Sequence, residues 1–548
     1  MYTLSSKLKT FSLILMVLGI LGIGYGFLTA PKTVQDVEAM LKAEEQAGHG
    51  HGAGHGPQVQ HDIKDDTEID NPAKYQTGGE THSTGTGVHD ASAKGLNETT
   101  GAPAAEDTTG TPASAQSAGS TAAAMEQSAS ATQATQQTAP AQTEMHHQAV
   151  PAQTEMHHQA VGADHVSAAD AHKEHEEHVL HVLHQLQNKP WAAVYVACIF
   201  FMLLTMGVLA FYAIQQVAQA GWSPVLFRVM QGITAYLLPG SIIFFILLLL
   251  SGFHANHLFV WMADGITDPA SANYDKLIAN KSGYLNVPFW LIRAAIFLAG
   301  WNLYRFYSRR NCLAQDDADH DLNYKKNFKM SAGFLVFFIV TESIMSWDWI
   351  MSVDPHWFST LFGWYVFASF FVSGITTITM VTLYLKSKGY LEYVNTSHLH
   401  DLAKFMFGIS VFWTYLWFSQ FMLIWYANIP EEVTYFVTRI EQYNLPFFGA
   451  VVMNFIFPIL ILVNTDFKRV TWILVMAGVV ILAGHYIDFF NMIMPATVGD
   501  RWFIGAAEIG AVLFFLGLFI FIVFSALTKA PLLPKRNPFI EESKHFHY

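Results

Sequence analysis

Five ionisable residues lie inside, or at the ends of, stretches that are otherwise apolar. They are Arg293, Glu342, Asp348, His485 and Asp488. Because an ionisable side chain is costly inside a membrane, such residues mark either a functional site, often a proton relay, or a buried ion pair. His485 and Asp488 are three residues apart and therefore share one face of a helix. The ion-pair alternative would join Arg293 to Glu342.

Hydroxyl side chains recur in the apolar stretches that follow Glu342. Ser369, Ser373 and Thr376 have helical spacing, and Tyr415 lies in the next stretch. Hydroxyls both donate and accept hydrogen bonds, so this set could carry protons inward from Glu342. The alternative is ordinary packing of small polar residues between membrane helices.

Ten apolar runs must position these residues. They cover residues 11–30, 191–214, 229–252, 287–306, 329–350, 359–385, 404–427, 445–464, 470–493 and 505–528. Each run is long enough to cross a bilayer as a helix, and none alternates as a barrel strand would. Charged residues make up only 13% of the chain, compared with about 25% in soluble proteins. We therefore predict an all-α integral membrane protein with about ten transmembrane helices.

The distribution of Lys and Arg predicts the orientation of the chain. With the N-terminus inside, the short outer loops hold only Lys276, Lys281, Arg439 and Arg501. Both termini, including a tail at 529–548, are then cytoplasmic. The five ionisable residues fall in the outer half of the membrane, where they could converge on one outward-facing pocket.

The N-terminal third has a different organisation. We predict an uncleaved transmembrane helix within residues 1–31, because Pro31 directly follows the apolar run. Its four glycines either contact another helix closely or face lipid. Residues 32–170, which contain PAQTEMHHQAV twice, are rich in His, Ala, Thr and Gln, and we predict them to be a disordered insert on the outer side. For residues 171–190 we predict an amphipathic helix that lies on the membrane surface. We expect this helix to end before Pro190.

Cofactor motifs are missing from the sequence. Cys198 and Cys312 are too few to hold an iron–sulfur cluster, and only His485 lies well within an apolar run, whereas haem b needs two facing histidines. Sixteen of the 25 histidines lie in the insert and the helix predicted after it, residues 32–190. They are either a metal-binding or pH-sensing tract or a tolerated low-complexity segment. We expect no metal, cofactor or catalytic residue in this chain, and no nucleic-acid partner.

Several long motifs resemble a known family. They are GWSPVLFRVMQGITAYLLPG, ANKSGYLNVPFWLIRAA, ESIMSWDWIMSVDPHWFSTLFGWYVFASFFVSGI, FGISVFWTYLWFSQFMLIWY and GHYIDFFNMIMPATVG. They are similar to the NrfD-like (polysulfide-reductase-like) membrane subunits of bacterial alternative complex III, in particular to the second of these, the ActF type. The resemblance covers residues 191–548 and the first helix, but not most of residues 40–170.

The resemblance implies a nine-helix NrfD-like domain at 191–528, and two four-helix bundles flanked by the first and last helices. It implies a quinol:cytochrome c or quinol:oxidase electron-transfer complex in the bacterial inner (cytoplasmic) membrane, with the insert in the periplasm. The implied partners are a sister NrfD-like subunit, an iron–sulfur subunit, multihaem cytochrome c subunits and a terminal oxidase. Haem c and iron–sulfur clusters would belong to those partners, with menaquinol nearby.

The family places acidic and histidine residues at positions such as Glu342, Asp348, Asp354, His356 and His485. We therefore expect a cofactor-free subunit that provides a proton-translocation path. Glu342 would be its central acid, His485 and Asp488 would relay protons, and the loop residues would shape the outward exit. The rival interpretations are a stand-alone secondary transporter, in which Gly or Pro breaks helices at mid-membrane, and a structural scaffold subunit.

Overall fold

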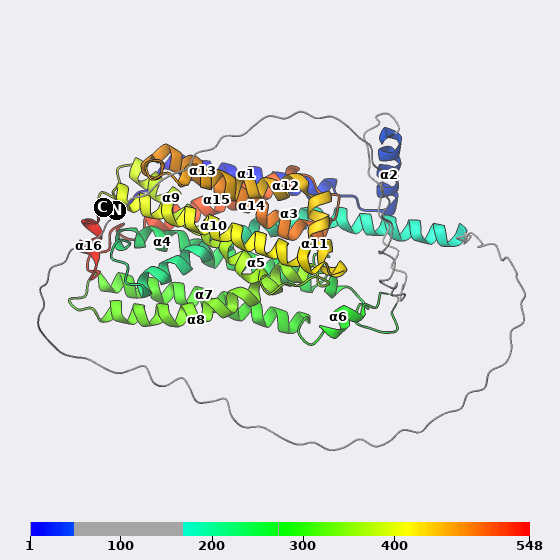
Figure 1. Ribbon diagram of the computed structural model, residues 1–548, viewed down its shortest axis with the longest axis horizontal. Coiled ribbons are helices and arrows are strands. Elements are labelled where there is room, and N and C mark those ends of the chain that lie inside the picture. The colour runs from blue at the N-terminus through cyan, green and yellow to red at the C-terminus, as the bar shows by residue number, and fades with distance from the viewer. Residues whose placement is uncertain (1, 49–167, 272, 548) are drawn as a thin grey trace, which may run out of the picture. The chain divides into compact units, whose positions relative to one another are not determined.

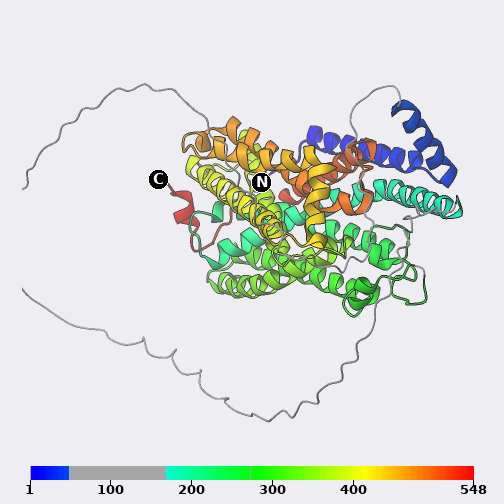
Figure 2. The same cartoon turned by 45° about the vertical axis from the view of Figure 1, so that its right-hand side comes forward.

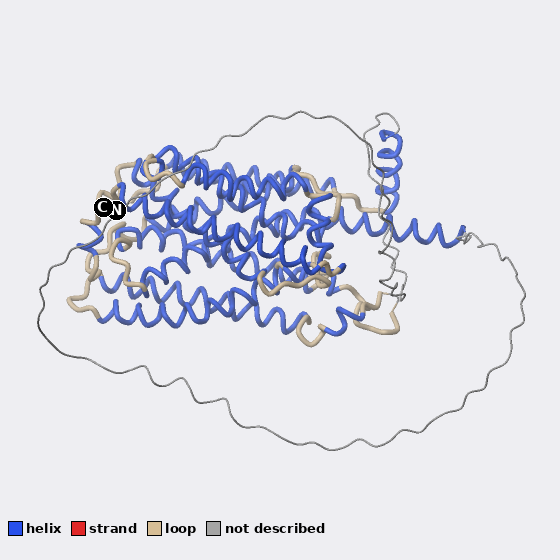
Figure 3. Tube along the Cα trace, in the orientation of Figure 1, coloured by secondary structure: helices blue, strands red, loops and turns tan. Residues whose placement is uncertain are grey.

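The computed structural model describes residues 2–48, 168–271 and 273–547. Figure 3 shows that this part of the chain consists of helices and connecting loops and contains no strand. The helices are α1 Ser6–Thr29, α2 Val34–Gly48, α3 Ala168–Val217, α4 Phe227–Ile233, α5 Leu237–Gly252, α6 Lys276–Asn280, α7 Val287–Gln315, α8 Leu322–Trp349, α9 Phe362–Ser387, α10 Thr396–Ala427, α11 Pro430–Glu441, α12 Asn444–Val451, α13 Phe457–Leu462, α14 Thr471–Val498, α15 Ala506–Leu527 and α16 Ile540–Lys544.

Ten helical segments of the described chain are long and apolar enough to cross a membrane. They correspond one to one with the ten predicted runs, so the predicted all-α membrane fold is confirmed. Several helices extend beyond their apolar run, because backbone hydrogen bonding continues into the polar ends; α7, for example, continues to Gln315.

The membrane helices pack as two groups around α3 (Figures 1 and 2). The first group joins α3 to α5, α7 and α8, and the second contains α9, α10, α14 and the broken span α12–α13. α1 packs along α15, so the first and last spans form a pair beside the two bundles. The two chain ends lie at one end of this assembly and α2, α6 and α11 lie at the other (Figure 1). We call these the terminal end and the insert end.

Glycines allow the close approach of α1 to α15. A Cβ atom at Gly19 would lie 2.4 Å from the backbone nitrogen of Phe514, and one at Gly22 would lie 2.7 Å from the carbonyl oxygen of Ala506. Such a contact between small residues is a common basis of helix association in membranes. Gly24 has no atom within 4 Å of its Cβ position, so the contact uses one face of α1 only.

The structure corrects two predictions about the insert end. The stretch before Pro190 is not a separate surface helix; it is the first part of α3, and Pro190 lies inside that helix. The proline removes one hydrogen bond, but the neighbouring turns continue the helix. Residues 34–48, expected to be disordered, form α2, whose Val37 packs against Val179 and Val182 of α3. The remainder of the predicted disordered segment, from residue 49 to 167, lies outside the described residues.

Candidate functional site

A buried polar centre lies between α9, α10 and α14, around Asp488. The Asp488 carboxylate accepts hydrogen bonds from the hydroxyl of Tyr365, from Ser369 Oγ at 2.8 Å and from Trp413 Nε1 at 2.9 Å. Asp488 is 2% exposed and His485 is fully buried. An ionised carboxylate has about four acceptor positions, so three donors occupy most of them. The helices therefore bring together five side chains from three spans, including the predicted His485, Asp488 and Ser369.

Hydrogen bonding assigns the tautomer of His485. Its Nδ1 lies 3.0 Å from Ser369 Oγ and 3.8 Å from an Asp488 carboxylate oxygen. Because Ser369 already donates its only hydroxyl proton to Asp488, Nδ1 of His485 must donate to Ser369. Nε2 then carries a lone pair, and within the described part of the chain it has no hydrogen-bond partner. His485 thus has one nitrogen connected to Asp488 and the other available to accept a proton.

A small cavity connects this centre with the insert end. Tyr365, which donates to Asp488, lines it together with Gln420, Arg439 and Asn491 and with aromatic side chains of α10 and α11. The centre of a water molecule can occupy about 10 Å³ there, which is room for about one water. The Arg439 guanidinium donates to the backbone carbonyl of Asn491 at 3.0 Å. A water molecule in this cavity would lie between Tyr365 and Arg439 of α11.

Arg293 and Asp348 form a separate, closed ion pair at the insert end of α7 and α8. Arg293 Nε and Nη2 contact the two oxygens of Asp348 at 2.7 and 2.9 Å. Tyr284 OH donates to the same carboxylate at 2.8 Å. Burial and the adjacent Asp348 charge raise the pKa of Tyr284 above its ordinary value, which keeps the phenol protonated. The proposed pairing of Arg293 with Glu342 is wrong, because Asp348 takes the guanidinium in bidentate geometry.

Glu342 is isolated from both of these groups. It is 4% exposed, Ser343 Oγ lies 3.2 Å from one of its oxygens, and the other oxygen has no partner among the residues that the structure describes. No hydrogen bond or ion pair in this described part of the chain joins it to His485 or Asp488. The five ionisable residues therefore do not converge on one pocket.

Asp354 and His356 lie in the loop after α8. His356 Nε2 is 2.6 Å from a carboxylate oxygen of Asp275, and its side chain is 51% exposed. Partial burial alone would raise the pKa of Asp275, because it disfavours the ionised form. The pKa nevertheless lies below the ordinary value, because the ionised carboxylate accepts hydrogen bonds from the backbone amides of Ile278 and Leu277 and interacts with His356. Asp354 is half-buried and acts electrostatically on Lys281. These contacts fix a surface loop and do not reach Asp488.

The hydroxyl residues have different surroundings. Ser373 Oγ donates to the carbonyl of Ser369 on its own helix, whereas Thr376 Oγ1 is buried and has no partner among the described residues. The placement of Tyr415 on an inner path is wrong, because this side chain is 64% exposed. Two residues correspond to about 200° around a helix, so Tyr415 faces away from the buried Trp413.

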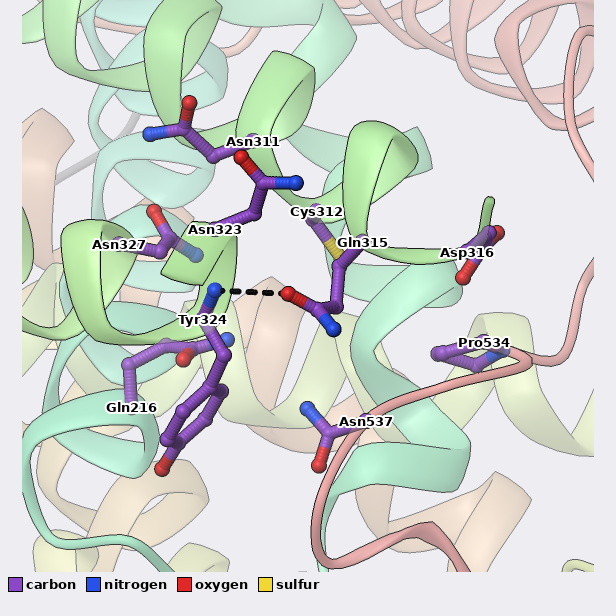
Figure 4. Close-up of a pocket in the computed structure, with 10 residues that line it drawn as sticks. All are labelled: Gln216, Asn311, Cys312, Gln315, Asp316, Asn323, Tyr324, Asn327, Pro534 and Asn537. Atoms are coloured by element: carbon purple, nitrogen blue, oxygen red, sulfur yellow. Dashed lines mark hydrogen bonds between the residues drawn. The ribbon is translucent and has the colours of Figure 1, made fainter. Parts of the chain in front are cut away.

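A second polar cluster, which the sequence analysis did not identify, lies at the terminal end of the first bundle. Figure 4 shows amide side chains around a small cavity with room for about one water. They include Gln216, Asn311, Gln315, Asn323, Asn327 and Asn537. Beside them the Arg228 guanidinium lies 2.5 Å from the Asp316 carboxylate. The hydroxyl oxygen of Tyr212 accepts hydrogen bonds from the side chains of Gln216, Gln231, Ser308 and Asn327. These six amides lie just beyond the ends of the predicted apolar runs, so the search for polar residues within the runs did not find them.

The polar side chains of this cluster continue only a short way along α8. Asn327 is followed one turn later by Ser331, which hydrogen-bonds Tyr304 OH at 2.8 Å. Phe334 then stacks on the Tyr304 ring with centroids 3.9 Å apart. From Ser331 to Glu342 the helix rises about 16 Å, so this hydrogen-bonded series ends well before Glu342.

Among the residues that the structure describes, no group of three or more His, Cys, Asp or Glu side chains is arranged to hold a metal ion. The chain matches no known protein-family model and no curated protein sequence. The function must therefore be argued from the geometry of the polar centres and from the resemblance of the sequence motifs.

Proposed function

We propose that this chain provides a path for protons across a membrane, with Asp488 and His485 as its central exchanging pair. The observation that carries the proposal is the buried centre in which Asp488, Ser369 and His485 are connected by hydrogen bonds of 2.8 and 3.0 Å. Paired acid and imidazole groups inside membrane spans are the usual components of proton relays. Asp488 replaces Glu342 as the central acid because Glu342 has no relay partner.

The sequence of transfers follows from the hydrogen bonds. A proton that reaches His485 Nε2 forms an imidazolium, whose Nδ1 proton can pass to Ser369 as the Ser369 proton passes to Asp488. Tyr365 then connects the protonated acid to the cavity beside Arg439. The transfers from His485 through Ser369 to Asp488 occur between groups within hydrogen-bond reach, as proton transfer requires. Arg439 at the outer mouth repels a returning positive charge, which favours release toward the insert end.

The biological setting of this path rests on the resemblance alone. It would make the chain a cofactor-free subunit of a quinol:cytochrome c or quinol:oxidase complex, beside a sister NrfD-like subunit, an iron–sulfur subunit and multihaem cytochromes c. In that setting the terminal end faces the bacterial cytoplasm and the insert end faces the periplasm, as the Lys and Arg distribution also favours. A tagged chain purified in mild detergent would then carry haem c absorption bands and an iron–sulfur protein. A colourless, solitary chain would refute the complex.

The path itself is tested by proton uptake into liposomes that contain the tagged, full-length chain. A potassium gradient with valinomycin supplies the driving potential, and an internal pH dye reports uptake. We expect Asp488→Asn to lower uptake by about tenfold or more, because an amide cannot accept the proton. The matched control is Glu342→Gln, which neutralises the other isolated buried carboxyl and should retain most of the uptake. Equal uptake by wild type and Asp488→Asn would refute the proposal.

One observation favours a second candidate, a secondary transporter. The span from Asn444 to Leu462 is broken by a π-helical turn at Val452–Ile456 and by Pro458, and interrupted helices at mid-membrane are typical of transporter sites. A transporter would move protons only together with a solute. Uptake of protons by the chain without any added solute therefore distinguishes the proton path from this alternative.

A further inference from the structure

The π-helical turn at Val452–Ile456 places an unpaired amide in the interior of the second bundle. Asn454 is fully buried, and neither its Nδ2 nor its Oδ1 has a hydrogen-bond partner among the described residues. A π-turn within a membrane span is uncommon, and such turns are frequent at functional sites. Buried amide atoms normally have partners, so this amide calls for a ligand.

The neighbouring helix is shaped around the same amide. A Cβ atom at Gly484 would lie 2.2 Å from Asn454 Oδ1, so only glycine leaves room for the amide at this point of α14. The next residue is His485, whose Nε2 has no partner among the described residues and accepts rather than donates. Pro458 has no backbone N–H, so a carbonyl of the π-turn, one helical turn earlier in the chain, loses its usual hydrogen-bond donor. Unpaired polar atoms therefore lie on both the π-turn and α14, the two elements that meet at Gly484.

We propose that Asn454 and His485 Nε2 hold an internal water molecule that delivers protons to His485. The combination of groups selects water: Asn454 Nδ2 is a donor and His485 Nε2 is an acceptor, whereas a metal cation would require acceptors only. A proton that arrives from the terminal side binds the oxygen of this water as another of its O–H bonds breaks and the N–H bond forms at Nε2. The water is regenerated and one proton is transferred, so charge and atoms balance.

This inference rests on the proposed function and extends it toward the terminal end. The outer cavity beside Tyr365 receives protons from Asp488, and the site at Asn454 supplies them to His485. Thr376 Oγ1, a buried hydroxyl on α9 with no partner in the described chain, lies beside Gly478 of α14. Gly478 precedes Gly484 by six residues, or about 9 Å along α14 toward the terminal end. Thr376 therefore supplies a buried hydroxyl on the inner side of this site.

Liposome uptake with the full-length chain tests the role of Asn454. Asn454→Leu keeps the side-chain volume but removes both polar atoms, and we expect uptake to fall by about tenfold. Asn454→Ser keeps a hydroxyl and leaves space for water, so it should restore at least half of the wild-type uptake. Gly484→Ala should also lower uptake, whereas Gly449→Ala, at a position with no atom within 4 Å, is the matched control and should not.

The outcomes separate this inference from the proposed function. If Asn454→Leu retains wild-type uptake while Asp488→Asn has lost it, the water site is refuted and the path through Asp488 stands. If Asp488→Asn retains uptake, the proposed function fails and the transfer role assigned to the water fails with it.

Infrared spectroscopy of the wild-type chain tests the water site without any variant. An internal water beside an imidazole gives an O–H stretch that shifts in ¹⁸O-labelled water. We expect this band in the wild type and in Gly449→Ala, and its loss in Gly484→Ala. A wild-type spectrum without an isotope-sensitive internal band would overturn the inference, even if Asn454→Leu failed to fold.

Discussion

Replacement of Asp488 separates its structural role from its role in proton exchange. Asp488→Leu removes the acceptor for three buried donors, on Tyr365, Ser369 and Trp413. An unpaired buried donor costs about 1–3 kcal/mol. We therefore expect Asp488→Leu to lower the free energy of unfolding by about 3 kcal/mol or more.

Asp488→Asn should cost far less. The amide oxygen can accept from Ser369 and Trp413, and the amide nitrogen can donate to the Tyr365 oxygen once its hydroxyl has turned. We expect a loss within about 1 kcal/mol, although proton uptake is lost in both variants. A carboxylate that both accepts hydrogen bonds from buried donors and exchanges a proton should give this contrast: the Asn variant is folded but inactive, and the Leu variant is destabilised.

Thermal unfolding in detergent measures the difference between the two variants. For a domain of this size, a loss of about 3 kcal/mol corresponds to a midpoint lower by roughly 3–4 °C. The Asn variant should remain within about 1 °C of wild type. Equal midpoints for wild type and Asp488→Leu would refute the claim that three buried donors depend on this side chain.

Three further predictions follow from the same structure. Arg293→Met leaves the buried Asp348 carboxylate without its counter-charge and should cost about 3–5 kcal/mol, whereas the double variant with Asp348→Leu should recover much of that loss in the same unfolding assay. Gly22→Val should separate α1 from α15 and expose α1 to limited proteolysis, while Gly24→Val, at an open position, should not. Because the pKa of Asp275 is lowered in the folded protein, its contribution to stability is present above the ordinary Asp value and is lost as the pH falls through the folded pKa. The hydrogen-exchange protection factors of α6, which correct for the intrinsic exchange rate at each pH, should therefore fall at acidic pH in wild type, and Asp275→Asn should remove that pH dependence.

The spans were predictable because their length and composition are one-dimensional properties of the sequence. A helix needs only about 20 apolar residues to cross a bilayer, and every predicted run corresponds to such a helix. The shared face of His485 and Asp488 was likewise predictable from their spacing. Even Tyr415 could have been placed correctly, since helical periodicity separates it from the buried Trp413 by more than half a turn.

Pairing between helices was not predictable from the sequence alone. Glu342 and Asp348 lie on one helix, less than two turns apart, and the relative depth of α7 decides which of them meets Arg293. The importance of Asn454 depends on a local change of helix type and on the absence of a side chain at Gly484. Both are properties of packed backbones, and the only available signal in the sequence was an amide that precedes a proline in an apolar run.

The most direct test of the central claim is infrared difference spectroscopy of the full-length chain in liposomes as the external pH is changed. A proton path through His485 and Asp488 predicts a reversible carboxyl or imidazole band that appears within the mixing time and is missing in Asp488→Asn. An identical difference spectrum for wild type and Asp488→Asn would mean that the centre exchanges no protons with the surrounding water, which would contradict the account.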